Sequence, residues 1–435
     1  MRCAMDVVLS SRIARILLVV AALASEAIIG LAAGRNWLAA HLYGTTNPAD
    51  WKRAVQLEPG NAAYWDRTGL YEQWDFMHGN VETAIGDFRR ATQLDPRSAH
   101  EWMALAGAFE AADELNQAQQ AYERAQAAHP VSAEVAWRYG SYLLRRGNLD
   151  GAAAKVKRAL SDDPSLAGSA ISQFWEAGAG IHLILDRVLP PRPDVYLTAI
   201  DYFVAHKENG AAVACWEKLA GLGQKVPLTR SFDLIQNLID ANQIPDADRI
   251  WQQALTLAGH PGEAEAGGSL IFNGGFERDL VNGGFGWRQT PAAGTAFDLV
   301  TDVAQAGSQS ARVVFDGSAN VDYGNLVQYV PLTPGEGYRL TAYMRTDSIT
   351  TDSGPQFQIQ SCSNPPQVLA ETPPMTGTHP WTEVQAEFRA GSALDCLRVV
   401  LRRKPSELLA NKISGTVWVD DVRLEPLARS GGQPR

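Results

Sequence analysis

The stretch SLIFNGGFERDLVNGGFGW, residues 269–287, interrupts a chain that has the pattern of helices for most of its preceding length. Its Asn-Gly-Gly and Gly-Gly-Phe-Gly clusters are poor helix formers and favour turns. A second stretch, TVWVDDVRLEP at residues 416–426, alternates apolar and polar residues with the period of two that a β-strand requires. We therefore predict that these two stretches are the first and last strands of one β-sandwich.

Short alternating runs fill the interval between the two stretches, and turn-forming clusters such as AGSQS, TPGEG and TDSGP separate them. In TPGEGYRL, a tight turn leads directly into one of the runs. Several short strands at this spacing predict an all-β sandwich. The runs are ARVVFD, NLVQYVPL, YRLTAYMR, QFQIQS, WTEVQAEF, CLRVVLRR and TVWVDDVRL.

Prolines mark a repeat in the preceding helical half, at spacings of 37, 34 and 34 residues. Alanines and large residues recur at constant offsets before each proline, so small side chains let two helices approach and large ones fill the seam. This pattern resembles the tetratricopeptide repeat, most fully over residues 99–132 and 133–166. The resemblance implies a solenoid of stacked helix pairs, whose groove in that family binds a peptide or protein. The prolines are Pro59, Pro96, Pro130 and Pro164.

Three residues on the predicted first helices of the repeats are candidates for this groove: His100, Met103 and Trp137. Trp137 lies one position later than the Trp of the repeat pattern. It is therefore either an exposed contact for a protein partner or a core residue. A further interpretation of the solenoid is a spacer that holds the C-terminal domain away from a membrane.

Motifs of the β-rich part follow one another in an order that resembles a family. They are Asn-Gly-Gly-Phe-Glu, Gly-Trp, Gly-Ser-Gln-Ser-Ala-Arg-Val, Pro-Gly-x-x-Tyr, Trp-Thr-x-Val and Val-Asp-Asp-Val-x-Leu. Together they resemble a carbohydrate-binding module of the family 4/9/22 type, a jelly roll of the galactose-binding-like group. The resemblance covers residues 268–427 and implies this fold more firmly than sugar binding, because such jelly rolls also serve as plain interaction domains.

Sugar sites pair an aromatic platform with amides, carboxylates or guanidinium groups. If their strands adjoin, the polar-facing residues of the predicted strands form one hydrophilic face with aromatic residues in it and at its rim. Two arginines on this face would suit an acidic polysaccharide. The alternative is an ordinary solvated side of a sandwich. The candidates are Tyr343, Arg345, Gln358, Gln360, Arg398, Arg402, Tyr323 and Tyr329.

The same resemblance implies a structural calcium ion where the first and last strands meet. Calcium takes six to eight oxygen ligands from carboxylates and carbonyls. The candidate ligands are Glu277, Asp420 and Asp421. The alternative is a set of solvated acids beside Arg278 or Arg423.

The N-terminal segment ILLVVAALASEAIIGLAAG, residues 16–34, is apolar and near the lower length limit for a membrane span. Its length favours an uncleaved anchor, whereas Ala22-Leu23-Ala24 and Glu26 favour a cleaved signal peptide. Arginines precede the segment, so the positive-inside rule places the remaining chain outside the cytoplasm. We predict a single-pass protein of the cell inner membrane with periplasmic C-terminal domains.

That location bears on two cysteines in the β-rich part. Cys362 and Cys396 fall on runs that neighbouring strands could contain. In an oxidising compartment they either form a disulfide or remain as two buried thiols.

Composition and motifs exclude several classes of function. The net charge of −10 and the absence of a basic block argue against nucleic-acid binding. No nucleophile elbow, phosphate loop or metal-spaced histidine pair is present in the sequence, so no enzymatic activity is expected. The predicted chain is multidomain α plus β: an N-terminal membrane helix (1–40), a tetratricopeptide-like α-solenoid (41–262), a β-sandwich jelly roll (268–427) and a disordered tail (428–435).

These features predict a non-catalytic, envelope-associated adaptor. The solenoid would bind a protein partner and the jelly roll a polysaccharide, for example during export or assembly of a cell-surface glycan. One alternative is a purely protein-binding scaffold whose sandwich never contacts sugar. Another is an accessory of a glycoside hydrolase.

Overall fold

The computed structural model describes residues 11–75, 77, 79–260 and 268–427. The chain divides into two compact units, Met1–Pro190 and Pro191–Arg435. The tail predicted for 428–435 lies outside the described residues. The helices are α1 (Arg12–Tyr43), α2 (Pro48–Leu57), α3 (Ala62–Trp74), α4 (Val81–Leu94), α5 (Ala99–Ala111), α6 (Leu115–Ala128), α7 (Ala133–Arg145), α8 (Leu149–Asp162), η1 (Pro164–Leu166), α9 (Ala167–Glu176), α10 (Ile181–Leu183), η2 (Ile184–Val188), α11 (Pro193–Ala205), α12 (Asn209–Gly221), η3 (Leu228–Ser231), α13 (Phe232–Asp240) and α14 (Ile244–Ala258).

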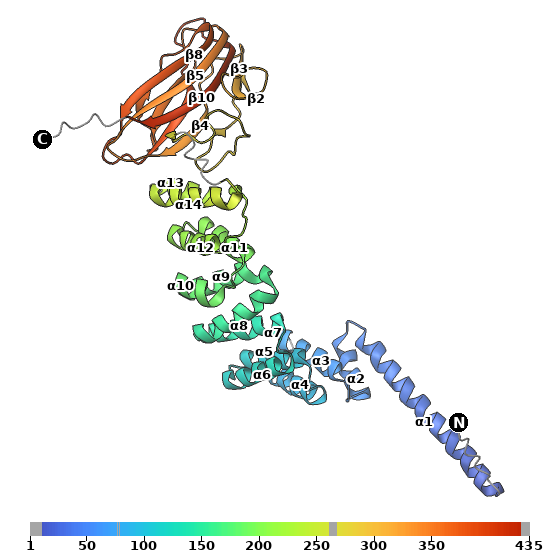
Figure 1. Ribbon diagram of the computed structural model, residues 1–435. Coiled ribbons are helices and arrows are strands. Elements are labelled where there is room, and N and C mark those ends of the chain that lie inside the picture. The colour runs from blue at the N-terminus through green and yellow to red at the C-terminus, as the bar shows by residue number, and fades with distance from the viewer. Residues whose placement is uncertain (1–10, 76, 78, 261–267, 428–435) are drawn as a thin grey trace, which may run out of the picture. The chain divides into compact units, whose positions relative to one another are not determined.

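The second unit adds two antiparallel sheets to helices α11–α14 (Figure 1). The β9 sheet has the strand order β1-β4-β9-β6-β7, and the β10 sheet has the order β2-β3-β10-β5-β8. The strands are β1 (Arg288–Gln289), β2 (Thr295–Val300), β3 (Ser310–Asp316), β4 (Tyr323–Pro331), β5 (Gly337–Ile349), β6 (Gln356–Ser361), β7 (Val368–Glu371), β8 (Gly377–Arg389), β9 (Cys396–Arg403) and β10 (Ser414–Pro426).

The helices of the first unit pair as the repeat pattern predicts, with α3–α4, α5–α6 and α7–α8 forming hairpins. A Cβ atom on Gly69 would lie 2.8 Å from Cε1 of Phe88, and one on Gly140 would lie 2.7 Å from Cγ2 of Val156. Glycine therefore lets the two helices of a hairpin approach, and the buried large residue fills the seam. The four predicted prolines each come two residues after a helix ends and stop it.

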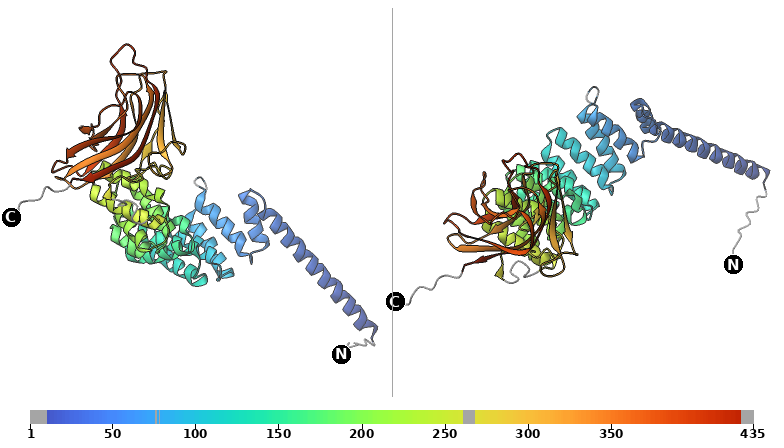
Figure 2. Two further views of the ribbon diagram at one scale, coloured as in Figure 1. Left: turned by 45° about the horizontal axis from the view of Figure 1, so that its top comes forward. Right: turned by 90° about the horizontal axis from the view of Figure 1, so that it is seen from above.

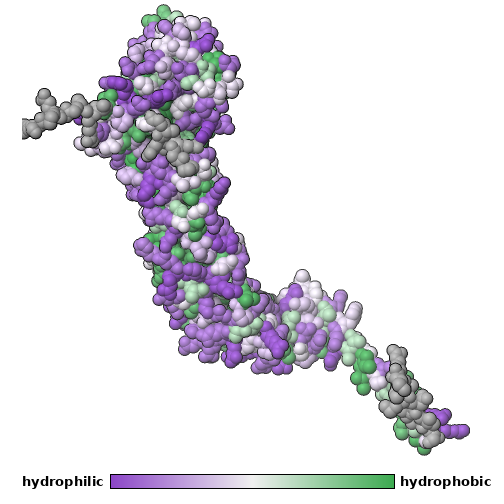
Figure 3. All heavy atoms as spheres, viewed as in Figure 1, coloured by the Kyte–Doolittle hydropathy of each residue, from purple (hydrophilic) through white to green (hydrophobic). Residues whose placement is uncertain are grey.

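The predicted apolar segment lies within one continuous helix, α1, which extends away from the hairpins as a single helix (Figure 2). Its apolar side chains are exposed, including Ile28 at 67% and Leu31 at 76%. In Figure 3, hydrophobic surface is visible along this helix. Among the described residues, α1 is the one helix long and apolar enough to cross a membrane. Its last turns belong to the solenoid, because Ala39 is fully buried and Tyr43 packs against Tyr64.

The sandwich core lies between the two sheets and includes residues from 271 to 424. The last strand, β10, occupies the centre of its sheet, where Val419 is opposite Ala311 of β3 on one side and Met344 of β5 on the other. Both neighbours form hydrogen bonds with the backbone of β10, so the last strand lies inside the sheet and not at its edge.

The prediction that 269–287 forms the first strand is wrong. Asn273 and Phe276 have φ values of 52° and 54°, in the left-handed region that turns use. The segment instead lies beside the end of β10, where Val422 N donates to Gly274 O at 2.9 Å. A Cβ on Gly274 would lie 2.0 Å from the Val422 carbonyl oxygen, so this approach requires glycine. Phe276 is fully buried in the sandwich core.

The second glycine pair of the same stretch contacts the last helical hairpin. A Cβ on Gly283 would lie 2.1 Å from Cδ2 of Phe232, and one on Gly284 would lie 2.4 Å from Cζ3 of Trp251. The Trp251 ring also meets the Phe272 ring edge-on at a centroid distance of 5.3 Å and is 1% exposed. The α13–α14 hairpin and the sandwich therefore share a packed aromatic interface.

Gly283→Ala is expected to weaken this interface, because the added methyl group overlaps the Phe232 ring. Overpacking of this kind costs roughly 1–3 kcal/mol. Urea unfolding of the full chain would measure the loss. Gly391→Ala is the matched control, since a Cβ there meets no atom within 4 Å, and its unfolding should change by less than about 0.5 kcal/mol. Equal stability of the two variants would contradict the proposed contact.

Candidate functional site

Trp137 lines a hollow of about 730 Å³ on the first unit. Helix α7 supplies Trp137, Ser141 and Leu144 to the hollow, and α9 supplies Gln173 and Glu176. The indole is half-buried, whereas a core position would bury it completely. An apolar ring beside polar side chains in a concave surface is suited to binding part of another molecule.

The arginines of this hollow are held by acids. Arg145 Nη2 lies 2.6 Å from Glu110 Oε2, and the Tyr122 hydroxyl donates to Glu110 Oε1 at 2.7 Å. Arg138 pairs with Glu134 at 3.0 Å on the same helix. These contacts orient the side chains around Trp137, so the hollow presents an apolar surface with a polar rim.

The other two predicted groove residues, Met103 and His100, differ in their exposure to solvent. Met103 is 4% exposed and packs against Ala125 and Val135, so its prediction as a groove contact is wrong. A side chain at the seam between two repeats has almost no surface left for a partner. His100 is exposed, and its Nε2 lies 3.4 Å from Asp66 Oδ2, a contact that raises the pKa of the imidazole.

Next to His100 lies a buried acid that the sequence analysis missed. Glu101 is 7% exposed and faces Asp66, and Oε2 of Glu101 and Oδ1 of Asp66 are buried without a hydrogen-bond partner among the described residues. Burial and then the charge of Asp66 raise the pKa of Glu101 to about 7. The equivalent third residues of α3 and α7 are Tyr64 and Val135. The sequence did contain a signal for this buried acid, because Glu101 is acidic at a repeat position that is otherwise apolar.

On the sandwich, three predicted residues join one hydrogen-bonded row on the outward side of the β9 sheet. Arg398 Nη2 donates to Gln360 Oε1, and Gln360 Nε2 donates to Gln358 Oε1, both at 2.9 Å. Gln358 Nε2 in turn donates to Glu371 Oε2 at 2.9 Å, which also receives Lys404 Nζ at 2.8 Å. Glu371 and Lys404 were not predicted, and the bond from Lys404 lowers the pKa of Glu371.

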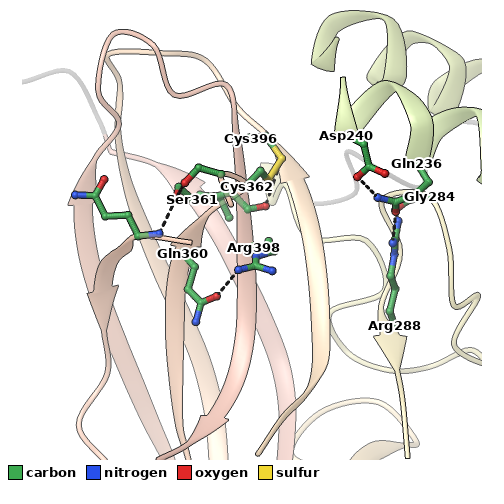
Figure 4. Close-up of a disulfide and its surroundings, with 12 residues drawn as sticks. Gln236, Asp240, Gly284, Arg288, Gln360, Ser361, Cys362, Cys396 and Arg398 are labelled. Atoms are coloured by element: carbon green, nitrogen blue, oxygen red, sulfur yellow. Dashed lines mark hydrogen bonds between the residues drawn. A yellow bond between two sulfur atoms is a disulfide. The ribbon is translucent and has the colours of Figure 1, made fainter. Parts of the chain in front are cut away.

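An aromatic ring lies beside this row. Tyr329 of β4 is opposite Arg398 in the register and is half-buried. The Arg288 guanidinium lies over the Tyr329 ring at 4.6 Å and donates to Gln236 of α13. Figure 4 shows Arg288 directed toward α13 and Arg398 directed toward Gln360. We call Tyr329, Gln358, Gln360, Arg398 and Glu371 the β9 face.

Three of the predicted sugar contacts are not accessible to a sugar in the way that the sequence predicted. Tyr323 is 1% exposed and belongs to the core, so its prediction as a platform is wrong. Gln358 is 2% exposed and holds its neighbours instead of presenting its amide to solvent. Arg402 forms an ion pair with Asp322.

The prediction of a single face that includes Tyr343 and Arg345 is wrong, because their strand pairs with β8 and β10 and not with β6 or β9. Both residues lie on the β10 sheet. There the Tyr343 hydroxyl donates to Glu383 at 3.1 Å, and Arg345 covers the Trp418 ring at 5.2 Å. Alternation along each strand was readable from the sequence, whereas strand order was not.

Two of the three carboxylates predicted to bind calcium accept hydrogen bonds from the loop of residues 305–309. Glu277 accepts from the backbone and hydroxyl of Ser308, which lowers its pKa. Asp420 is fully buried and accepts from Gln305 N at 2.8 Å, and its burial raises its pKa. Asp421 pairs with Arg423 at 2.8 Å. Within the described ranges no three His, Cys, Asp or Glu side chains are grouped to hold a metal ion. Calcium binding at this corner therefore stays a prediction.

The two cysteines of the sandwich are joined in the structure. Cys362 and Cys396 form a disulfide with a Cα–Cα distance of 5.6 Å. The bond links the residue after β6 to the first residue of β9 and lies close to Arg398 (Figure 4).

Glu101→Gln is expected to change how stability depends on pH. The folded-state pKa of Glu101, about 7, is above its ordinary value of 4.5, so the native state holds a proton that the unfolded chain releases. The stabilisation by this proton is complete below pH 4.5 and is lost as pH rises through 7. Amide hydrogen exchange measures the free energy of opening of α3 and α5. The gain in this free energy of the variant over the parent chain should be larger at pH 8 than at pH 5 by on the order of 2 kcal/mol. Glu82→Gln, an exposed acid of α4, is the control, and a pH-independent difference for Glu101→Gln would contradict the expectation.

Comparison with family models agrees with the first of the two resemblances. Residues 111–167 match the tetratricopeptide repeat family, so the chain carries tetratricopeptide repeats. No curated relative matches the chain at a significant level. The similar solved structures include "Crystal structure of MamA" (18% identity, 40% of this chain and 84% of that chain, TM-score 0.27), "CBM4 structure and function" (15%, 36% and 99%, 0.28) and "Crystal structure of PilW, widely conserved type IV pilus biogenesis factor" (17%, 44% and 93%, 0.30). At these TM-scores the likenesses carry no argument about function.

Proposed function

We propose that this chain is a non-catalytic adaptor anchored in the inner membrane, with a solenoid that binds a protein partner and a sandwich that binds polysaccharide outside the cytoplasm. The observation that carries the proposal is the β9 face, where an aromatic ring, a guanidinium and amides lie together. Export or assembly of a cell-surface glycan is the process in which such an adaptor would act.

The β9 face has the chemistry of a sugar site. Arg288 covers one face of the Tyr329 ring, and the apolar side of a sugar would stack against the opposite face. Arg398 and Gln360 are half-buried beside this ring, and the Nε of Arg398 is buried without a hydrogen-bond partner among the described residues. The bonds to Gln358 and Glu371 hold these side chains in place, so little conformational freedom is lost when hydroxyl groups bind.

The hollow around Trp137 supports the second part of the proposal. A half-buried Trp such as Trp137, which lies between polar side chains, is a typical anchor for a protein partner. The hollow draws on α7 and α9, the first helices of neighbouring helix pairs. A segment of another protein could therefore contact two repeats at once.

Helix α1 supports anchoring. Residues 16–34 span about 28 Å as a helix, close to the hydrocarbon thickness of a bilayer. Cleavage after Ala24 would leave Ile28, Ile29 and Leu31 in water, where all three are at least 66% exposed. A lipid environment removes this cost.

Substitutions on the two outer faces of the sandwich test sugar binding. Affinity electrophoresis of the full chain, in gels that contain xylan, β-glucan or alginate, should show retardation by at least one polysaccharide. Arg398→Ala with Gln360→Ala should abolish the retardation, because both hydrogen-bonding groups of the β9 face are lost. Tyr343→Ala with Arg345→Ala on the β10 sheet should leave it unchanged. Retardation by none of a broad polysaccharide panel would favour the alternative, a scaffold that binds only proteins.

Membrane anchoring is tested by the mature N-terminus and by extraction. The chain purified from cells should retain residues before Arg12 and should stay with membranes after alkaline carbonate washing. A chain that begins at Thr45 should be released, because it lacks α1. Mass spectrometry that finds Ser25 as the first residue would overturn the anchor.

A further inference from the structure

A second groove, of about 360 Å³, lies between α4 and α6. Its floor contains Leu105 and Phe109 of α5, which are 3% and 5% exposed, together with the half-buried Trp102. The Trp102 Nε1 donates to the Pro96 carbonyl at 3.0 Å, so its polar atom is already bonded and its ring adds apolar surface. This groove shares no lining residue with the hollow around Trp137.

Two arginines stand on opposite walls of this groove. Arg89 of α4 and Arg124 of α6 are both exposed, and neither forms an ion pair within the described part of the chain. The Arg89 guanidinium lies over the Phe109 ring at 5.3 Å, which directs it along the floor. No acidic side chain lines the groove, although the whole chain carries a net charge of −10.

Helix α6 adds two amide side chains to the wall that carries Arg124. Gln117, Gln120 and Arg124 occupy positions i, i+3 and i+7, so they share one side of the helix. Amide side chains both donate and accept hydrogen bonds, as the backbone of an extended peptide requires. Guanidinium groups bind carboxylates with two parallel hydrogen bonds.

We propose that this groove binds an extended acidic peptide segment that carries an apolar side chain between its carboxylates. The apolar side chain contacts the half-buried ring of Trp102, and the carboxylates pair with Arg89 and Arg124. The site goes beyond the proposed function, because it gives the solenoid a second protein-binding surface whose partner is defined by charge.

Fluorescence anisotropy with labelled decapeptides tests the proposal on the full chain in detergent. The probe is a peptide of glutamates with a central phenylalanine, and the reference probes replace either the phenylalanine by serine or the glutamates by lysine. The acidic phenylalanine peptide should bind most tightly, with an affinity that falls as sodium chloride rises. Failure of this peptide to bind, or equal binding of the lysine peptide, would overturn the proposal.

Matched variants locate the binding. Arg89→Gln with Arg124→Gln should weaken the acidic peptide at least tenfold. Arg90→Gln with Arg158→Gln removes the same charge outside the groove and should change the affinity by less than twofold. Arg124→Gln alone, at a side chain without a described partner, should still weaken binding severalfold while the melting temperature stays constant. If the two double variants lost the same amount of affinity for the acidic peptide, net charge alone would explain the binding, and the proposed site would be overturned.

Discussion

The close contact between Gly283-Gly284 and the rings of Phe232 and Trp251 is the constraint on which the second unit depends. Any side chain at these two positions would overlap an aromatic ring, so the backbone itself is the packing surface. Because Trp251 also touches Phe272, the last helical hairpin and the sandwich share aromatic residues at their junction. The hairpin therefore serves as a packing partner of the sandwich as well as the end of the solenoid.

Glycine has the same role inside the hairpins and at the end of β10. Gly69 admits the Phe88 ring, Gly140 admits Val156, and Gly274 admits the Val422 carbonyl. In each case a small residue permits an approach that a larger one would block, and a large buried group supplies the apolar contact. The cores of the helical and β parts are thus built by one rule of alternating small and large residues.

The β9 face and the groove between α4 and α6 differ in how their charges are held. On the β9 face, Glu371 accepts from Gln358 and Lys404, and this network orders the neighbouring side chains. In the groove, the Arg89 guanidinium packs over the Phe109 ring and forms no ion pair with an acid among the described residues. The first arrangement suits neutral hydroxyl groups that need fixed partners, whereas the second suits an anionic ligand.

Sequence periodicity by itself determined the local features: the helix hairpins, the prolines that end them, the apolar helix and the inward positions of the strands. It also indicated that Gln360, Arg398 and Tyr329 point outward, because alternation is a property of each strand alone. Only the tertiary structure decided which strands are neighbours, and so separated Tyr343 and Arg345 from the β9 face and buried Tyr323. The tertiary structure also decided where residues 269–287 pack. Their glycines indicate a close backbone approach, but the sequence does not identify the segment that is approached. The physical reason is that hydrogen-bond pairing between distant segments sets strand order and docking, and no local pattern encodes the partner.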